Sequence, residues 1–322
     1  MAPRELDKAT WRRARGHRRT SWPTLGILAL NAPLVAATVA LAQCESLCLS
    51  ACAVLTLLPW LLHCYLIQHE CAHGAVFVNH RYNVALGHAL GFLIFTPFLS
   101  RRHAHALHHA WTGHPEHDPT NARAIQRFSM LSPRSLAVLS ALWRAWVPFL
   151  ALGERIGLWR APFLEPHAAQ QRAIYLQLAC YGILIACLYW LDCLVRSACI
   201  YATSLVLLWV VEELINLPHH LRAPLTRSRL PTWQQGGVTH SCAHVPIWSS
   251  WVLLNFNLHE AHHVWPSRPW HELRAAHREL QRASEPTVVS NELSWSLEQR
   301  RLPFTTVLHA YLVASLQTLR DE

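Results

Sequence analysis

The chain has 322 residues, of which 52% are hydrophobic and only 15% are charged. Soluble proteins carry charge on about a quarter of their residues, so this composition argues against a soluble protein and favours a membrane protein. The formal charge of +9 would suit a nucleic-acid partner, but no nucleic-acid-binding motif accompanies it. We therefore expect the basic residues to flank membrane helices on their cytoplasmic side.

The first two apolar runs follow a basic polar segment, residues 1–24. They occupy residues 25–42 and 47–67, and each is about long enough to cross a hydrocarbon core of ~30 Å as a helix. Only four residues separate the two runs, which predicts a helical hairpin. A third apolar run, residues 86–99, is too short to span and is expected to lie in the membrane interface.

Two further long apolar runs occupy residues 173–191 and 198–217, and the second is interrupted near its end by Glu212 and Glu213. A short link again predicts a hairpin. Arginines are abundant before the first hairpin, between the hairpins and after the second, so the positive-inside rule places these segments and both termini in the cytoplasm.

The sequence thus predicts an all-α, multi-pass integral membrane protein with four transmembrane helices in two hairpins. The membrane domain is expected to cover residues 25–275, and residues 276–322 are expected to form a cytoplasmic tail.

Ten of the 23 histidines gather in four short motifs beside the predicted cytoplasmic ends of the helices. HECAH at 69–73 has histidines four residues apart, and both HALHH at 105–109 and HEAHH at 259–263 have the HxxHH spacing. In NLPHH at 216–220, Asn216 precedes His220 by four residues. Imidazole is the commonest metal ligand in proteins, and together these motifs offer enough ligands for two metal ions in a cytoplasmic helical cap.

These motifs resemble the histidine boxes of the membrane fatty-acid desaturase family, which includes carotenoid ketolases and related lipid hydroxylases. Two further features support the resemblance: a Pro-Trp segment follows the third box in NLHEAHHVWPSRPW at 257–270, and Gly113 and Asp118-Pro119 follow the second box. The resemblance covers roughly residues 45–275. It implies a non-haem di-iron centre, molecular oxygen and an external electron donor.

The resemblance implies nine histidine ligands for the two iron ions: His69, His73, His105, His108, His109, His220, His259, His262 and His263. It also implies that Asn216 approaches a metal through water. His219 is expected either to bind a metal or to lie beside a ligand. Glu212 and Glu213 are candidates for orienting imidazoles through hydrogen bonds.

The implied activity is oxygen-dependent desaturation of a fatty acyl chain or related lipid. Hydroxylation or ketone formation on a carotenoid or another specialised lipid stays open, because the same ligands serve all three reactions. No cytochrome-b5-like or ferredoxin-like segment is visible, so we expect a separate electron donor, a ferredoxin or a reductase. An Arg-rich face that includes Arg101 and Arg102 is the predicted docking surface.

Two rival classes use the same residue types. A zinc- or copper-dependent membrane hydrolase stays open on the histidines alone. A metal transporter would place its ligands near the middle of the bilayer. This chain places nearly all its histidines outside the predicted spans, with His63 as the main exception, so transport is disfavoured.

Overall fold

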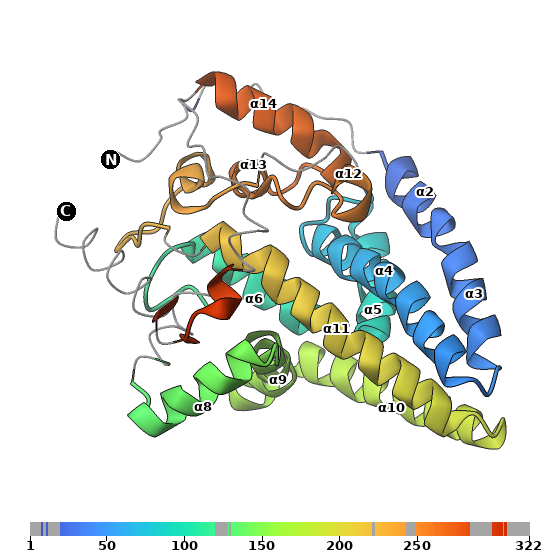
Figure 1. Ribbon diagram of the computed structural model, residues 1–322. Helices are drawn as coiled ribbons and strands as arrows, with labels where there is room; N and C mark the ends of the chain where they lie inside the picture. The colour runs from blue at the N-terminus through green and yellow to red at the C-terminus, as the bar shows by residue number, and fades with distance from the viewer. Residues whose placement is uncertain are drawn as a thin grey trace.

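The computed structural model describes residues 20–119, 130–220, 223–242, 249–283 and 298–304, together with Lys8, Trp11, Phe128, Thr306 and Val307. Every regular element in this described part is helical (Figure 1). The prediction of an all-α chain is therefore confirmed for these residues.

Four helices are long and apolar enough to cross a membrane, which confirms the predicted number of long apolar helices. The first is built from α2 (Trp22–Leu30) and α3 (Ala32–Ala42), and the others are α4 (Leu47–Ala72), α10 (Ala168–Trp190) and α11 (Leu194–His220). A helix suits such runs because it satisfies its own backbone polar groups, which lipid cannot do. Both α4 and α11 continue past the predicted apolar runs, so that they carry two of the histidine motifs.

Two pairs of shorter helices are sharply bent. The angle is 108° between α5 (His80–Leu93) and α6 (Phe98–Trp111), and 109° between α8 (Pro133–Arg144) and α9 (Phe149–Leu164). Each pair has the length and composition of one broken span or of a re-entrant segment. The apolar run 86–99, predicted to be interfacial, is the end of α5, the bend and the start of α6.

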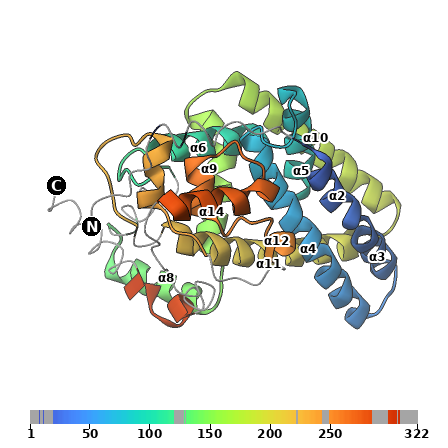
Figure 2. The ribbon, with the colours of Figure 1, turned by 90° about the horizontal axis from the view of Figure 1, so that it is seen from above.

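The central helix is α4, which packs against α3, α5 and α11 (Figures 1 and 2). Its side chains Leu61, Leu66 and Ile67 are fully buried in the main hydrophobic cluster. The apolar side chains of α10 are mostly exposed, which suits a helix whose neighbours include lipid.

His63, the histidine inside a predicted span, has polar partners on both sides of its ring. Its Nδ1 lies 2.9 Å from Nδ2 and 3.2 Å from Oδ1 of Asn31, the residue at which α2 passes into α3, and its Nε2 donates to the carbonyl oxygen of Trp251 at 2.8 Å. These contacts satisfy a polar side chain that would be costly to leave unpaired in an apolar environment.

The remaining short elements lie beyond the C-terminal ends of α4 and α11, at the top of Figure 1. They are the 3₁₀ turns η1 (Thr232–Val238) and η2 (Trp270–Glu272) and the helices α12 (Ser249–Val252), α13 (His259–Val264) and α14 (Leu273–Ala283). Helix α13 packs between η1 and α14. This arrangement places the HEAHH motif at 259–263 next to the ends of the long helices.

Candidate metal centre

Four helices bring the histidine motifs together. In α4, His69 lies in the last turn and His73 follows at the C-cap, on the same face because residues four apart are neighbours on a helix. Helices α6, α11 and α13 carry the other three motifs. Within the described residues, nine histidines form two groups that could each hold a metal ion, and they are the same nine that the resemblance implied.

The first group contains five histidines: His69, His73, His105, His109 and His262. One ligand nitrogen from each lies within 4.8 Å of every other. The Nε2 atoms of His73 and His105 are 2.7 Å apart, and those of His109 and His262 are 3.1 Å apart.

The second group contains four buried histidines: His108, His220, His259 and His263. The Nε2 of His259 lies 3.0 Å from that of His220 and 3.1 Å from that of His263. Since His108 and His109 are consecutive in α6 but belong to different groups, the two groups are adjacent. The rings of His109 and His263 stack across the boundary with their centroids 4.2 Å apart.

Four histidines of the first group have their pKa lowered by burial, which favours the neutral imidazole. Burial and, next, neighbouring histidines hold the pKa of His105, His109 and His262 well below its ordinary value, and burial lowers the pKa of His73 to about 3. Neutral imidazoles offer a lone pair, and Nε2 of His69 has no hydrogen-bond partner among the described residues. Lone pairs on neighbouring neutral imidazoles repel one another unless a cation lies between them. This set of nitrogen donors therefore fits a metal ion.

Asp118 orients one of these rings. Its Oδ1 lies 3.0 Å from Nδ1 of His108, and its Oδ2 accepts the backbone N–H of Gly113 at 3.1 Å. A carboxylate on Nδ1 fixes the tautomer that leaves Nε2 free for a metal. Gly113 has a φ of +79°, which an L side chain rarely adopts, so the turn after the second box depends on glycine here.

Gln235 in η1 contacts both groups, and the sequence motifs gave no indication of it. Its side-chain amide donates to the carbonyl oxygen of His109 at 2.6 Å, and its Oε1 lies 3.2 Å from Nδ1 of His263. Thr112 adds a hydroxyl 3.3 Å from the same Nδ1. Gln235 is distant in sequence from the second box, so only the folded chain brings it to the site.

The other four candidate residues lie outside the two groups. His219 bonds through Nδ1 to the carbonyl oxygen of His240 at 3.1 Å and stacks on His259 at 4.3 Å. Asn216 donates to the hydroxyl of Tyr65 and to the carbonyl oxygen of Glu212. The carboxylates of Glu212 and Glu213 form buried ion pairs with Arg155 and Arg300, respectively.

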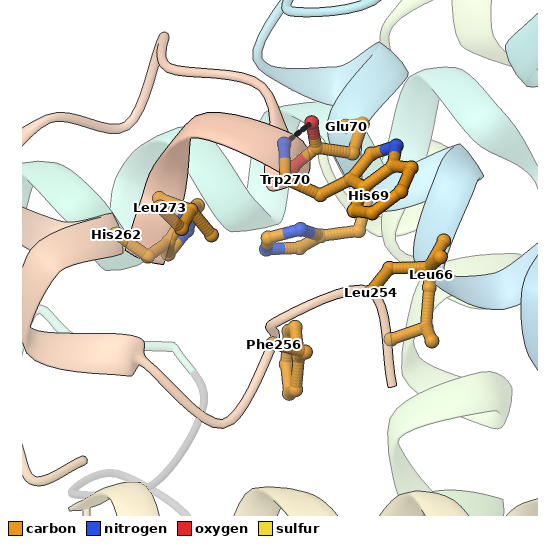
Figure 3. Close-up of a pocket in the computed structure, with 8 residues that line it drawn as sticks. All are labelled: Leu66, His69, Glu70, Leu254, Phe256, His262, Trp270 and Leu273. Carbon is orange, nitrogen blue, oxygen red and sulfur yellow. Dashed lines mark hydrogen bonds between the residues drawn. The ribbon is translucent and has the colours of Figure 1, made fainter. Parts of the chain in front are cut away.

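Glu70, between the two histidines of the first box, is buried and accepts the backbone N–H of Trp270 at 2.8 Å. This bond ties the first box to the Pro-Trp segment after the third box. Figure 3 shows the ring of His69 between the side chains of Trp270 and Phe256. A cavity of about 10 Å³ adjoins His69 here, which is room for about one water molecule.

The prediction that Arg101 and Arg102 lie together on an exposed docking surface is wrong for Arg101. Its side chain is buried, with the guanidinium 4.2 Å from the ring centroid of Tyr65. Arg102 is partly exposed and bonds to His80 at 2.8 Å. The i, i+1 pair points to different sides of α6, so the two arginines cannot form one exposed patch.

The described part of the chain is therefore a helical membrane protein whose buried histidine clusters are compatible with a metal site. The model of the fatty acid desaturase family matches residues 46–290, three quarters of the chain. The chain belongs to this family.

Individual relatives are distant. The chain is 24% identical over 227 residues to an sn-2 acyl-lipid omega-3 desaturase (ferredoxin) of the chloroplast of Helianthus annuus, covering 65% of this chain and 50% of that protein. It is also 24% identical over 230 residues to a fatty acid desaturase of Bacillus subtilis (strain 168), covering 68% of this chain and 64% of that protein. The chain thus spans about half the length of the first plant relatives and about two thirds of the bacterial one.

Proposed function

We propose that this protein is a membrane di-iron oxidoreductase that uses oxygen and external electrons to desaturate a fatty acyl chain of a lipid. One observation carries the proposal: a chain of the fatty acid desaturase family gathers nine histidines into two adjacent, mostly buried groups. The overall reaction takes O₂, two electrons, two protons and two hydrogens of the acyl chain, and it yields an alkene and two water molecules.

One iron would be held by the group of five histidines and the other by the group of four. Two irons bound here and reduced would supply the activation of O₂, which provides the oxidising power needed to remove hydrogen from an unactivated carbon. The protein supplies the orientation of the ligands. Asp118 and Gln235 fix the rings of His108 and His263, and the buried site keeps bulk water away from the reacting carbon.

The nature of the ligands favours iron in a redox role over a zinc hydrolase. Structural zinc takes four ligands and catalytic zinc takes three with one open position, whereas the first group alone has five histidines. Two adjacent groups with nitrogen ligands suit a pair of redox-active ions.

The membrane arrangement belongs to the same proposal. The four long helices form two hairpins, and the positive-inside rule places both termini and the metal centre on the cytoplasmic side. Electrons come from a separate carrier protein. The name of the Helianthus relative includes ferredoxin, and we propose an acidic carrier of this kind for the present chain.

The experiment reduces the detergent-purified protein with dithionite under anaerobic conditions, removes the excess dithionite, and then adds oxygen together with a membrane lipid extract. Oxygen uptake is followed, and the lipid products are analysed. We expect oxygen uptake that depends on the lipid, together with a new double bond in its acyl chains. Alcohol or ketone products without an alkene would replace desaturation by hydroxylation or ketone formation. Uptake that is the same with and without lipid would contradict the proposal.

A matched pair of variants tests whether activity belongs to the histidine groups. His262→Ala removes a ligand of the first group, whereas His167→Ala changes an exposed histidine that lies outside both groups. The first variant should lose activity and the second should retain it. Equal activity in both variants would contradict the ligand assignment.

A further inference from the structure

A cleft of about 400 Å³ opens beside the first group of histidines. Its lining includes Arg229, Thr232, Trp233 and Gln235 on one side and His109 and Ala110 on the other. These residues belong to η1, the segment before it and the end of α6, all outside the four long candidate spans. The cleft is therefore placed for a soluble partner rather than for a lipid that arrives sideways from the bilayer.

The floor of the cleft leads directly to both histidine groups. Gln235 lines the cleft and at the same time bonds to the backbone of His109 and to the ring of His263. His109 belongs to the first group and His263 to the second. A redox partner seated in this cleft would thus be separated from both groups by little more than one side chain.

The rim of the cleft is basic. The segment from residue 223 to 242 contains Arg227 and Arg229, both exposed, and no acidic residue. The guanidinium of Arg229 lies over the ring of Trp111 at 6.0 Å, and the ammonium of Lys8 lies over the ring of Trp233 at 5.3 Å. A basic rim with aromatic side chains is complementary to an acidic protein surface.

We propose that the acidic electron-carrier protein docks over this cleft, with Arg229 at the centre of the contact. This inference rests on the proposed function, since it names the site at which the donor of that reaction binds. In each encounter the carrier loses one electron and the metal centre gains it, so that two encounters supply the two electrons of one turnover. The surface replaces the one predicted at Arg101, which is buried.

The test compares Arg229→Glu with Arg134→Glu. Arg134 is also exposed but lies on α8, at the other side of Figure 1 from α13, so both variants make the same charge change on different surfaces. The probe is a chloroplast-type [2Fe–2S] ferredoxin with its reductase. Three quantities are measured: the Kd of the oxidised ferredoxin for the detergent-purified protein, the KM for ferredoxin in lipid-dependent turnover, and the KM for the lipid.

We expect Arg229→Glu to raise both the Kd and the KM for ferredoxin by about tenfold at low salt. The difference from the unaltered protein should shrink as salt is added. Arg134→Glu should change neither by more than about twofold, in keeping with a charge outside the contact. Iron content and the midpoint of thermal unfolding report whether either variant has lost its fold.

Three outcomes would overturn the inference. Equal Kd values for the two variants would exclude this cleft as the docking site. A raised KM for the lipid with an unchanged KM for ferredoxin would assign the cleft to the substrate. Absence of ferredoxin-driven turnover in the unaltered protein, with turnover after dithionite reduction intact, would exclude this class of carrier. Absence of turnover after dithionite reduction in the unaltered protein is different, because it removes the proposed function itself.

Discussion

Single side chains outside the ligand set hold the histidines in position. Asp118 and Gln235 each contact the Nδ1 of a histidine, which leaves the opposite nitrogen free. Partners of this kind commonly change metal affinity by about 10–100-fold when removed. The consequences can be tested at residues that never touch a metal.

Asp118→Ala should lower the affinity for iron by about 10–100-fold, because the ring of His108 loses the carboxylate that fixes its tautomer. Competition against a chromogenic iron chelator measures this affinity. Glu116→Ala is the control, since Glu116 is exposed in the same turn. Equal iron affinities in the two variants would show that Asp118 only closes the turn.

His277 gives a pH-dependent prediction away from the metal groups. Burial lowers the pKa of this histidine below its ordinary value of 6.5, and neither ring nitrogen has a hydrogen-bond partner in the described residues. The unfolded chain therefore binds a proton more readily than the folded chain, so stability falls as the pH drops below about 6.5. Above that pH, the ring is neutral in both states and the effect vanishes.

His277→Leu should consequently flatten the dependence of the thermal midpoint on pH between pH 7.5 and 5.5. The unaltered protein should lose more stability over this interval than the variant. The midpoint is measured in detergent at several pH values. Parallel curves for the two proteins would mean that His277 does not titrate in this way.

The nine grouped histidines could be found from the sequence because they stand in short motifs that resemble the histidine boxes of the family. Asp118 had a weaker mark, the Asp-Pro pair after the second box, which a simple turn would also explain. Gln235 had none: it reaches His109 across 126 positions of the chain, and no local pattern encodes such a contact.

At the scale of helices, long apolar runs predicted the four long helices, because hydrophobic length is what a bilayer requires. The bends between α5 and α6 and between α8 and α9 could not be predicted in the same way. They depend on close contacts across the bend, and hydrophobicity alone does not report those contacts. Two variants test what holds these bent pairs in place.

Gly91→Ala should disrupt the bend between α5 and α6, because a Cβ at this position would collide with the carbonyl oxygen of Thr96 and the side-chain amide of Gln68. Helix α6 carries His105, His108 and His109, so iron content should fall together with the thermal midpoint. Gly182→Ala in α10 is the control, since a Cβ there would have nothing within 4 Å. Normal iron content in Gly91→Ala would contradict this account of the bend.

Arg300 holds residues 298–304 against α8 and α9, the second bent pair. It forms a buried ion pair with Glu213, whose other oxygen accepts the backbone N–H groups of Leu150 and Ala151 at the start of α9. Arg300 also donates to the carbonyl oxygen of Trp143 at 3.2 Å and stacks on its ring at 3.9 Å. These contacts join α8, α9 and α11 to residues 298–304.

Arg300→Ala should destabilise the protein by about 3–5 kcal/mol, because it leaves a buried carboxylate without its partner. Arg301→Ala, at the exposed neighbouring position, should have almost no effect. Thermal midpoints in detergent measure both changes. Equal midpoints would mean that the buried pair contributes little to the stability of the fold.

At the scale of the molecule, the family and the all-helical architecture of the described residues agree with the sequence-based expectation. The mutual placement of the histidine motifs was also expected, because all four motifs follow predicted helix ends on one side. The burial of Arg101 was not expected, because neighbouring arginines in α6 separate into one buried and one partly exposed side chain. The charged residues of a sequence predict the sign of the net charge, but they do not show which side chains are exposed at the surface.

The central claim is that two adjacent histidine groups hold two irons. Its most direct test is the metal content of the detergent-purified protein, measured by mass spectrometry together with the content in His108→Ala and His262→Ala, which alter one group each. The account predicts about two irons per chain in the unaltered protein, and a clear loss of iron in each variant. Stable zinc in place of iron, or an unchanged iron content in both variants, would contradict it.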